Sequence, residues 1–126
     1  MSERKILVVD DDADLRLGLG VRLRAIKYAT IFAADGTTAI AMAQRERPDL
    51  ILLDLGLPAG DGFLVLERLR AIPKLAAIPV VVITARDVEE SRDRALGLGA
   101  VAFLQKPVDN AALLTAIRLA LREDIE

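Results

Sequence analysis

The stretch LILLDLGLP, residues 50–58, places four consecutive apolar residues directly before a single carboxylate, Asp54, and a loop marked by glycine and proline. A run that is apolar without polar alternation is typical of a strand buried on both faces, as in a parallel sheet covered by helices. Two other runs, residues 6–9 and 80–83, have the same character. Shorter or alanine-richer runs at residues 29–33 and 101–104 predict two edge strands, which makes five strands in all.

The segments between these runs carry apolar residues at helical spacing. The residues that show it are Leu15, Leu19, Leu23 and Ile26; Ala39, Ile40 and Ala43; Val65, Leu66, Leu69 and Ile72; and Leu113, Ile117, Ala120 and Leu121. Strands and helices alternate along the chain without a linker, repeat or low-complexity segment. This order predicts one doubly wound α/β domain over residues 1–126.

Two expected helices contain weak points. The segment 88–98 is mostly polar, with Ala95 and Leu96 as its main apolar anchors, so it should be the least firmly packed helix. Gly18 and Gly20 fall inside the first expected helix, where each costs about 1 kcal/mol relative to alanine. Close packing against this helix is the one explanation that the sequence offers for them.

The composition excludes several kinds of functional site and partner. The chain has 126 residues, a net charge of -2, no cysteine and no histidine. Disulfides, thiolate metal sites and a phosphohistidine on this chain are therefore excluded, and the lack of an Arg/Lys block argues against direct nucleic-acid binding by this domain. The N-terminal sequence has no signal peptide, and no apolar stretch is long enough to span a membrane, so we expect a cytoplasmic protein without a membrane partner.

Polar residues follow four of the five expected strands. They are Asp10, Asp11 and Asp12 after the first strand, Asp54 after the third, Thr84 after the fourth and Lys106 after the fifth. Because ligands of a doubly wound sheet bind at the carboxyl ends of its strands, these side chains should share one edge. Asp10, Asp11 and Asp54 together would repel one another unless a cation joined them. A hard ion with oxygen ligands, Mg²⁺, suits that set.

The charge of this site favours a phosphoryl group as its ligand. Three carboxylates, one Mg²⁺ and one lysine sum to zero, so an incoming phosphoryl group would meet no large repulsion. Lys106 and Thr84 would offer it a positive charge and a hydrogen-bond donor. Without histidine, cysteine or a catalytic serine context, the nucleophile must be a carboxylate, and its attack on phosphorus gives an acyl phosphate.

The motifs VVDDD (8–12), LLDLGLP (52–58) followed by DG (61–62), VVITA (81–85) and FLQKP (103–107) occur in this order, each at the end of an expected strand. In this respect the whole chain resembles the receiver domain of two-component response regulators, of the chemotaxis-regulator type. The resemblance implies a flavodoxin-like (βα)5 fold with a five-stranded parallel sheet in the order 2-1-3-4-5. It also implies a phosphorylation-switched signalling module, not an enzyme, whose phosphoryl group comes from a histidine kinase or a histidine phosphotransfer protein and whose downstream protein target is unknown.

The resemblance also assigns roles to residues. Asp54 corresponds to the phosphoacceptor, Asp10 and Asp11 to the acidic pair that holds Mg²⁺, with Asp11 as a direct ligand and the Gly56 carbonyl as another. Thr84 and Lys106 correspond to the hydroxyl and ammonium that contact the phosphoryl group, and Phe103, with Thr84, to the switch. Leu57 stands where many members have methionine, and Phe103 where tyrosine is frequent. Arg86 is long enough to reach over the acyl phosphate.

Each of these residues also has a purely structural interpretation. Asp54 could begin a turn, and Asp10, Asp11 and Asp12 could cap the first helix, Asp12 more readily than the others. Lys106 could be a surface lysine in a turn. A β-branched residue such as Thr84 is common at a strand end, and an aromatic residue such as Phe103 is common on a half-buried edge strand.

Three other function classes compete with the receiver interpretation. A Mg²⁺-dependent phosphohydrolase with an aspartyl nucleophile would need a second acid two residues after it, where this chain has Gly56. A flavin or nucleotide binder would need a phosphate-cradling loop after the first strand, where three aspartates would repel phosphate. The chain could also be the regulatory part of a DNA-binding factor, which its sequence neither shows nor excludes.

Overall fold

The structure is a computed structural model that describes residues 3–57, 62–85 and 88–123. Five parallel strands form one sheet in the order β2-β1-β3-β4-β5, which confirms the predicted flavodoxin-like arrangement. The strands are β1 (Lys5–Val9), β2 (Ala29–Ala33), β3 (Leu50–Leu53), β4 (Val80–Thr84) and β5 (Ala102–Gln105). The helices are α1 (Ala13–Ala25), α2 (Gly36–Glu46), α3 (Gly62–Ala71), α4 (Val88–Gly97) and α5 (Asn110–Leu121).

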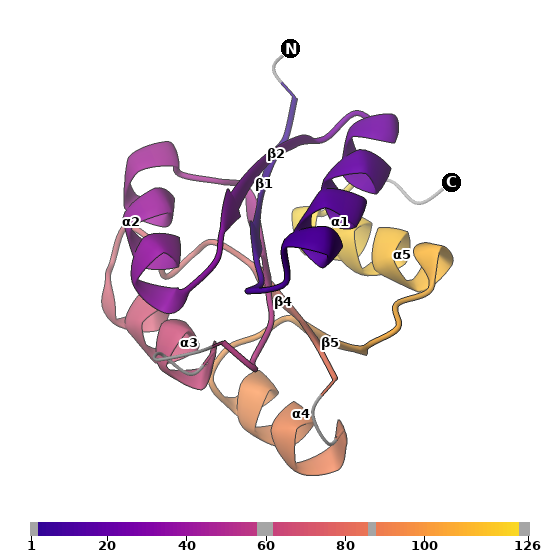
Figure 1. Cartoon of the computed structure of the whole chain (residues 1–126). Helices are drawn as coiled ribbons and strands as arrows, with labels where there is room; N and C mark the ends of the chain where they lie inside the picture. Colours follow the sequence, from indigo (N-terminus) through magenta and orange to yellow (C-terminus); the bar gives the residue numbers. More distant parts are fainter. Residues whose placement is uncertain (1–2, 58–61, 86–87, 124–126) are drawn as a thin grey trace.

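Helices cover both faces of the sheet, as Figure 1 shows. Alternate residues of the central strands belong to two separate cores. On one face Leu7, Val9, Ile51 and Leu53 pack with residues of α2, α3 and α4. On the other face Ile6, Val8, Leu50 and Leu52 pack with residues of α1 and α5. The continuous apolar runs of the sequence have this cause, because both faces of each central strand are buried.

The edge strand β2 has the expected bounds, whereas the edge strand β5 and the polar helix α4 differ from the sequence expectation in detail. The strand β5 begins at Ala102, one residue later than expected, although the Val101 N–H already donates to the Val80 carbonyl at 2.9 Å. In α4, Ala95 is buried as predicted, but the prediction of Leu96 as an anchor is wrong, since Leu96 is 39% exposed. Leu98, just after the helix, packs against the core instead. Arg86 lies outside the described residues.

The two glycines of α1 have different surroundings. A Cβ atom at Gly20 would lie 2.8 Å from Cζ of Phe32 on β2, so Gly20 permits the close packing that the sequence suggested. A Cβ atom at Gly18 would meet nothing within 4 Å, so packing within the chain does not explain this residue. Among the described residues, no helix combines the length and apolarity that crossing a membrane requires.

Candidate functional site

Two adjacent central strands place Asp10 and Asp54 side by side. Val9 and Leu53 are partners in the β1–β3 register, and each is followed directly by one of the aspartates. The Asp54 N–H donates to the Val9 carbonyl at 2.9 Å, and the Asp10 N–H donates to the Ala33 carbonyl at 3.1 Å. Both side chains are buried, with exposed fractions of 2% for Asp10 and 7% for Asp54. Backbone hydrogen bonds of the sheet therefore fix the base of the site.

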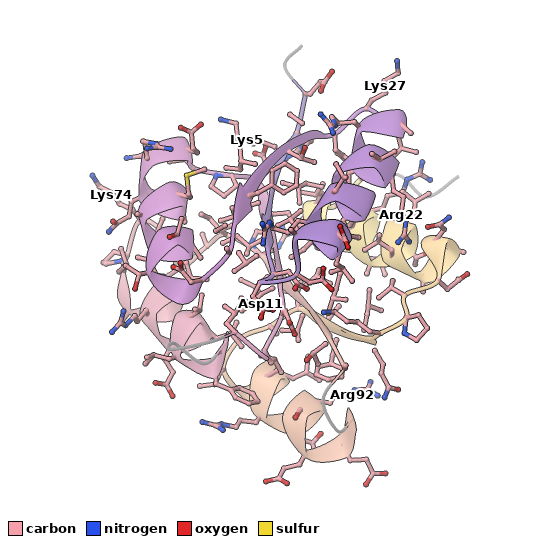
Figure 2. The ribbon with its side chains drawn as sticks, viewed as in Figure 1. Lys5, Asp11, Arg22, Lys27, Lys74 and Arg92 are labelled. Carbon is pink, nitrogen blue, oxygen red and sulfur yellow. The ribbon has the colours of Figure 1, made fainter. Side chains whose placement is uncertain are left out.

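Asp11 completes a group of three carboxylates. Asp10, Asp11 and Asp54 each offer one carboxylate oxygen, and these oxygens lie within 4.8 Å of one another. Asp11 is exposed, and Figure 2 shows it at the lower end of β1, where this strand leads into α1. Oxygen donors gathered at this separation suit a hard divalent cation such as Mg²⁺. The donor set therefore fits the metal that the sequence predicted.

The Lys106 ammonium lies between the two buried carboxylates. Its Nζ is 2.8 Å from Oδ2 of Asp10 and 3.4 Å from Oδ2 of Asp54. Burial alone would lower the pKa of the Lys106 ammonium, but the hydrogen bond to Asp10 and the charge of Asp54 outweigh burial and raise that pKa. Burial also raises the pKa of the Asp10 carboxyl, and the hydrogen bond from Lys106 offsets only part of this effect. The lysine therefore remains protonated and partly neutralises the acidic group.

Asp12 is a helix cap, in agreement with its structural interpretation. Its Oδ1 accepts hydrogen bonds from the N–H groups of Asp14 at 3.0 Å and Leu15 at 3.2 Å. The Asp12 N–H in turn donates to Oδ1 of Asp10 at 2.9 Å. Asp10 therefore supports the start of α1 with one oxygen and binds Lys106 with the other, so capping is not its only contact.

The loop after Asp54 is held close to its carboxylate. The Gly56 N–H donates to Oδ1 of Asp54 at 3.1 Å, and the following residue, Leu57, is buried in the core. Gly62, the first residue of α3, lies against the same backbone, since a Cβ atom there would be 2.6 Å from the Asp54 carbonyl oxygen and 2.5 Å from Cα of Leu55. The glycine of the DG motif thus lets α3 approach the strand end that carries Asp54. The sequence pattern alone does not indicate this role of Gly62.

Thr84 and Phe103 lie at and near the carboxyl ends of β4 and β5. Thr84 is 1% exposed, and its carbonyl accepts a hydrogen bond from the Lys106 N–H at 2.9 Å. Phe103 is a half-buried residue that pairs with Val82 in the sheet and packs against the core on the α2–α4 face. The structure thus brings Thr84 next to the backbone of Lys106, while Phe103 occupies an ordinary edge-strand position.

Sequence reasoning missed Arg16. Its Nη1 donates to the Asp10 carbonyl at 2.6 Å from a position inside α1. In the sequence an arginine at this place is indistinguishable from a solvated helix residue, because the contact depends on how far its side chain reaches back along the helix. A polar residue one turn after a predicted cap was the only signal for it.

The sequence model of the response regulator receiver domain matches residues 6–118. The response regulator PleD of Caulobacter vibrioides (strain NA1000 / CB15N) is 46% identical over 119 residues, which cover 94% of this chain and 26% of that protein. The DNA-binding dual master transcriptional regulator RpaA of Synechocystis is 37% identical over 118 residues, which cover 94% of this chain and 49% of that protein. The chain thus spans about a quarter to a half of the length of these curated relatives.

Solved structures agree with the sequence relatives. The receiver domain of the sensor histidine kinase PA1611 from Pseudomonas aeruginosa PAO1 has a TM-score of 0.88 at 29% identity, covers 97% of this chain and 100% of its own, and has a magnesium ion coordinated in its active-site cleft. The chemotaxis protein CheY4 of Vibrio cholerae has a TM-score of 0.88 at 28% identity, covering 94% of this chain and 99% of its own.

Proposed function

Because this chain belongs to the response regulator receiver domain family, we propose that Asp54 is the residue on which it carries its phosphoryl group. A carboxylate oxygen of Asp54 attacks the phosphorus of a phosphohistidine on a histidine kinase or phosphotransfer protein. The P–N bond breaks, the imidazole of the partner leaves and takes up a proton from solvent, and an acyl phosphate forms on Asp54. The observation that carries this proposal is the Lys106 ammonium, which lies 3.4 Å from Asp54 inside a group of three carboxylates.

The residues around Asp54 support this role by their charges. Lys106 is placed to neutralise an oxygen of the transferred group. The buried Thr84 lies at the end of β4. Asp10, Asp11 and the Gly56 carbonyl, with Asp54, would hold Mg²⁺. When bound, that ion supplies positive charge to the oxygens of the transferred phosphoryl group. The chain otherwise contributes position alone, which is most of what phosphoryl transfer demands.

Phosphorylation of intact protein tests the assignment of Asp54. A small phosphodonor such as acetyl phosphate, supplied with Mg²⁺, should add one phosphoryl mass to the wild type and none to Asp54→Asn. Asp12→Asn is the matched control, because Asp12 caps α1 and should not contact the transferred group. A similar mass increase in Asp54→Asn would show that the phosphoacceptor is a different residue.

Metal binding in the unphosphorylated protein tests the acidic pair. Asp11→Asn should weaken Mg²⁺ binding far more than Asp12→Asn, because Asp11 belongs to the three-carboxylate group and Asp12 is engaged with the backbone of α1. Calorimetric titration with Mg²⁺ measures both variants. Equal losses in the two variants would move the metal away from Asp11.

We infer that Thr84 and Phe103 form the switch that reads the phosphate. Thr84 would move toward a phosphoryl oxygen, and Phe103 would turn inward by packing alone, since it has no hydroxyl to donate. The weak anchoring of α4 supports this direction of change, because only Ala95 among its described side chains is buried. Comparison of the free and phosphorylated protein by NMR should place the largest shifts outside the site between Thr84 and Lys106. Shifts confined to α1 and α2 would contradict the switch.

The wider setting of the protein is also proposed. We expect residues 1–126 to act as one cytoplasmic receiver domain that catalyses only its own phosphorylation and dephosphorylation and passes the signal to a protein target. The name of RpaA describes a DNA-binding regulator, and RpaA is about twice as long as the segment it shares with this chain. An effector domain in the full-length gene would therefore decide the output, and the gene sequence is the observation that tests it.

A further inference from the structure

Arg16 makes a contact with the acidic site that the proposed chemistry has not used. It lies in α1, four residues after the cap Asp12, and its side chain is half-buried. Its Nη1 donates to the carbonyl of Asp10 at 2.6 Å. A guanidinium that donates to a carbonyl makes a charge-assisted hydrogen bond, which is stronger than a bond between neutral groups.

With this bond, both backbone groups of Asp10 and both of its carboxylate oxygens have partners. The N–H donates to Ala33, Oδ1 accepts from Asp12 and Oδ2 accepts from Lys106. The side-chain contact of the carbonyl comes from Arg16. Since the carbonyl of Asp10 and the N–H of Asp11 belong to one planar peptide unit, holding the first also fixes the second.

Asp11 differs from Asp10 in how it is held. Its side chain is exposed, yet one of its carboxylate oxygens lies within 4.8 Å of oxygens from Asp10 and Asp54. Within the described part of the chain, the Asp11 carboxylate accepts no hydrogen bond and forms no ion pair. Its position therefore depends on the backbone that carries it, and that backbone leaves β1 through the peptide that Arg16 holds.

We propose that Arg16 is a positioning residue for the metal site, which holds the Asp10–Asp11 peptide so that the Asp11 carboxylate stays directed toward Mg²⁺. This inference rests on the proposed function, because it concerns the metal that Asp10, Asp11 and Asp54 would bind. Residues behind the direct ligands commonly have such a role, and their loss costs about 10-fold or more in metal affinity.

The charge of Arg16 and its hydrogen bond have opposite effects on Mg²⁺ affinity. A guanidinium near the site repels an incoming cation, so removing its charge alone would strengthen Mg²⁺ binding. Removing its hydrogen bond frees the Asp11 backbone and weakens Mg²⁺ binding. The sign of the change in affinity therefore distinguishes a positioning role from a purely electrostatic one.

The test compares Mg²⁺ affinities of the full chain by calorimetric titration. Arg16→Met should bind Mg²⁺ about 10-fold more weakly than the wild type, and Arg16→Lys, which keeps a donor and the charge, should bind it more tightly than Arg16→Met. Arg24→Met is the matched control, because Arg24 also donates from α1 to a backbone carbonyl, that of Gly20, at 3.2 Å. Arg24→Met should bind Mg²⁺ as the wild type does.

An unchanged or stronger Mg²⁺ affinity in Arg16→Met overturns the inference. If Arg16→Met does not fold, Arg16→Gln takes its place, since its amide nitrogen ends two bonds short of the arginine Nη1, and wild-type affinity in that variant overturns the inference equally. A wild type that binds no Mg²⁺ and takes no phosphoryl group would instead contradict the proposed function. Failure of the two ideas is thus distinguishable.

A second measurement needs no metal. In chelator, the amide resonances of Asp11 and Asp12 should shift in Arg16→Met and stay in place in Arg24→Met, because the first variant releases the peptide that precedes them. Unperturbed Asp11 and Asp12 amides in Arg16→Met would show that the arginine does not hold this loop.

Discussion

Replacing Lys106 by methionine should destabilise the metal-free protein strongly. The ammonium lies 2.8 Å from one Asp10 oxygen and 3.4 Å from one Asp54 oxygen. At an effective dielectric constant of about 20, these attractions amount to about 6 and about 5 kcal/mol before desolvation is subtracted. Desolvation of buried ions cancels much of this, and removing one partner of a buried pair costs about 3–5 kcal/mol. Because the Lys106 side chain is 19% exposed, we expect the lower value, about 3 kcal/mol.

Denaturant unfolding followed by circular dichroism in chelator measures this loss. A decrease of about 3 kcal/mol should lower Tm by roughly 10 °C in a chain of this length. Lys5→Met is the matched control, since its ammonium lies 3.2 Å from Oε1 of Glu46 but both side chains are about a third exposed. Such a surface pair contributes about 0.2–1 kcal/mol. If Lys106→Met cost no more than Lys5→Met, the claim that Lys106 stabilises the acidic group would be wrong.

The pH dependence of the stability of Lys106→Met tests whether the unpaired Asp10 carboxylate causes the loss of stability. Burial raises the pKa of Asp10 above its ordinary value of 3.8 even with the lysine present, and loss of the lysine removes effects that lower it. The folded variant then binds a proton more tightly than the unfolded chain does. Its free energy of unfolding should therefore rise as the pH falls through the folded-state pKa toward 3.8, and the gap to the wild type should narrow. A gap that stayed constant would show that Asp10 is not the group left unpaired.

Two further predictions concern the fold. Gly18→Ala should raise the free energy of unfolding by about 1 kcal/mol, because helix propensity improves and a Cβ atom meets nothing within 4 Å. Gly20→Ala should be less stable than Gly18→Ala by about 1–3 kcal/mol, because its Cβ atom would meet Phe32. Denaturant unfolding compares the two variants, and equal effects would contradict the packing argument. Tyr28 is the chain's single tyrosine, so its phenolate absorbance reports its pKa, which burial and the hydrogen bond to Glu123 raise to about 12. Stability should fall as the pH rises from about 10, where the unfolded chain loses this proton, to about 12, and Glu123→Gln should lower the pKa of Tyr28; an unshifted titration would refute the contact.

The architecture could be predicted from the sequence because it depends on patterns that are local in the chain. Continuous apolar runs indicate strands buried on both faces, and parallel strands carry the residues that follow them to one edge. This logic was sufficient to bring Asp10, Asp11, Asp54 and Lys106 together. It needed no knowledge of side-chain conformation, since strand order and the residue after each strand determine the grouping.

Contacts that depend on the reach of single side chains could not be predicted in this way. The bond from Arg16 to the Asp10 carbonyl requires one arginine to fold back along its helix. Position 20 favours glycine because the ring of Phe32 on another element lies close to it. The helical pattern alone cannot distinguish Gly20 from Gly18. Leu96 was expected to anchor α4 because it is apolar, but the orientation of a short polar helix directs it outward and leaves Leu98 to pack instead.

The parts of the site differ in how firmly they are held, and this difference bears on where a phosphorylation signal can go. Asp54 is hydrogen-bonded to β1 through its N–H, and the backbone of α3 at Gly62 lies directly against it, so its position cannot shift without disturbing the centre of the sheet. When the charge changes at such a tightly packed residue, the structural change occurs in neighbouring elements that have an alternative packing arrangement.

The neighbours with that freedom lie on one side of the site. The helix α4 has one buried described side chain, Ala95, and is also tied to α3 by the Arg94 guanidinium, 4.0 Å from the centre of the Phe63 ring. A cation–π contact at a partly exposed site contributes about 0.5–1 kcal/mol, which is small beside the interactions of a phosphoryl group with Lys106. A structural change that begins at Asp54 should therefore displace α4 and β5 before it displaces α1, whose start is fixed by the cap at Asp12 and by Arg16.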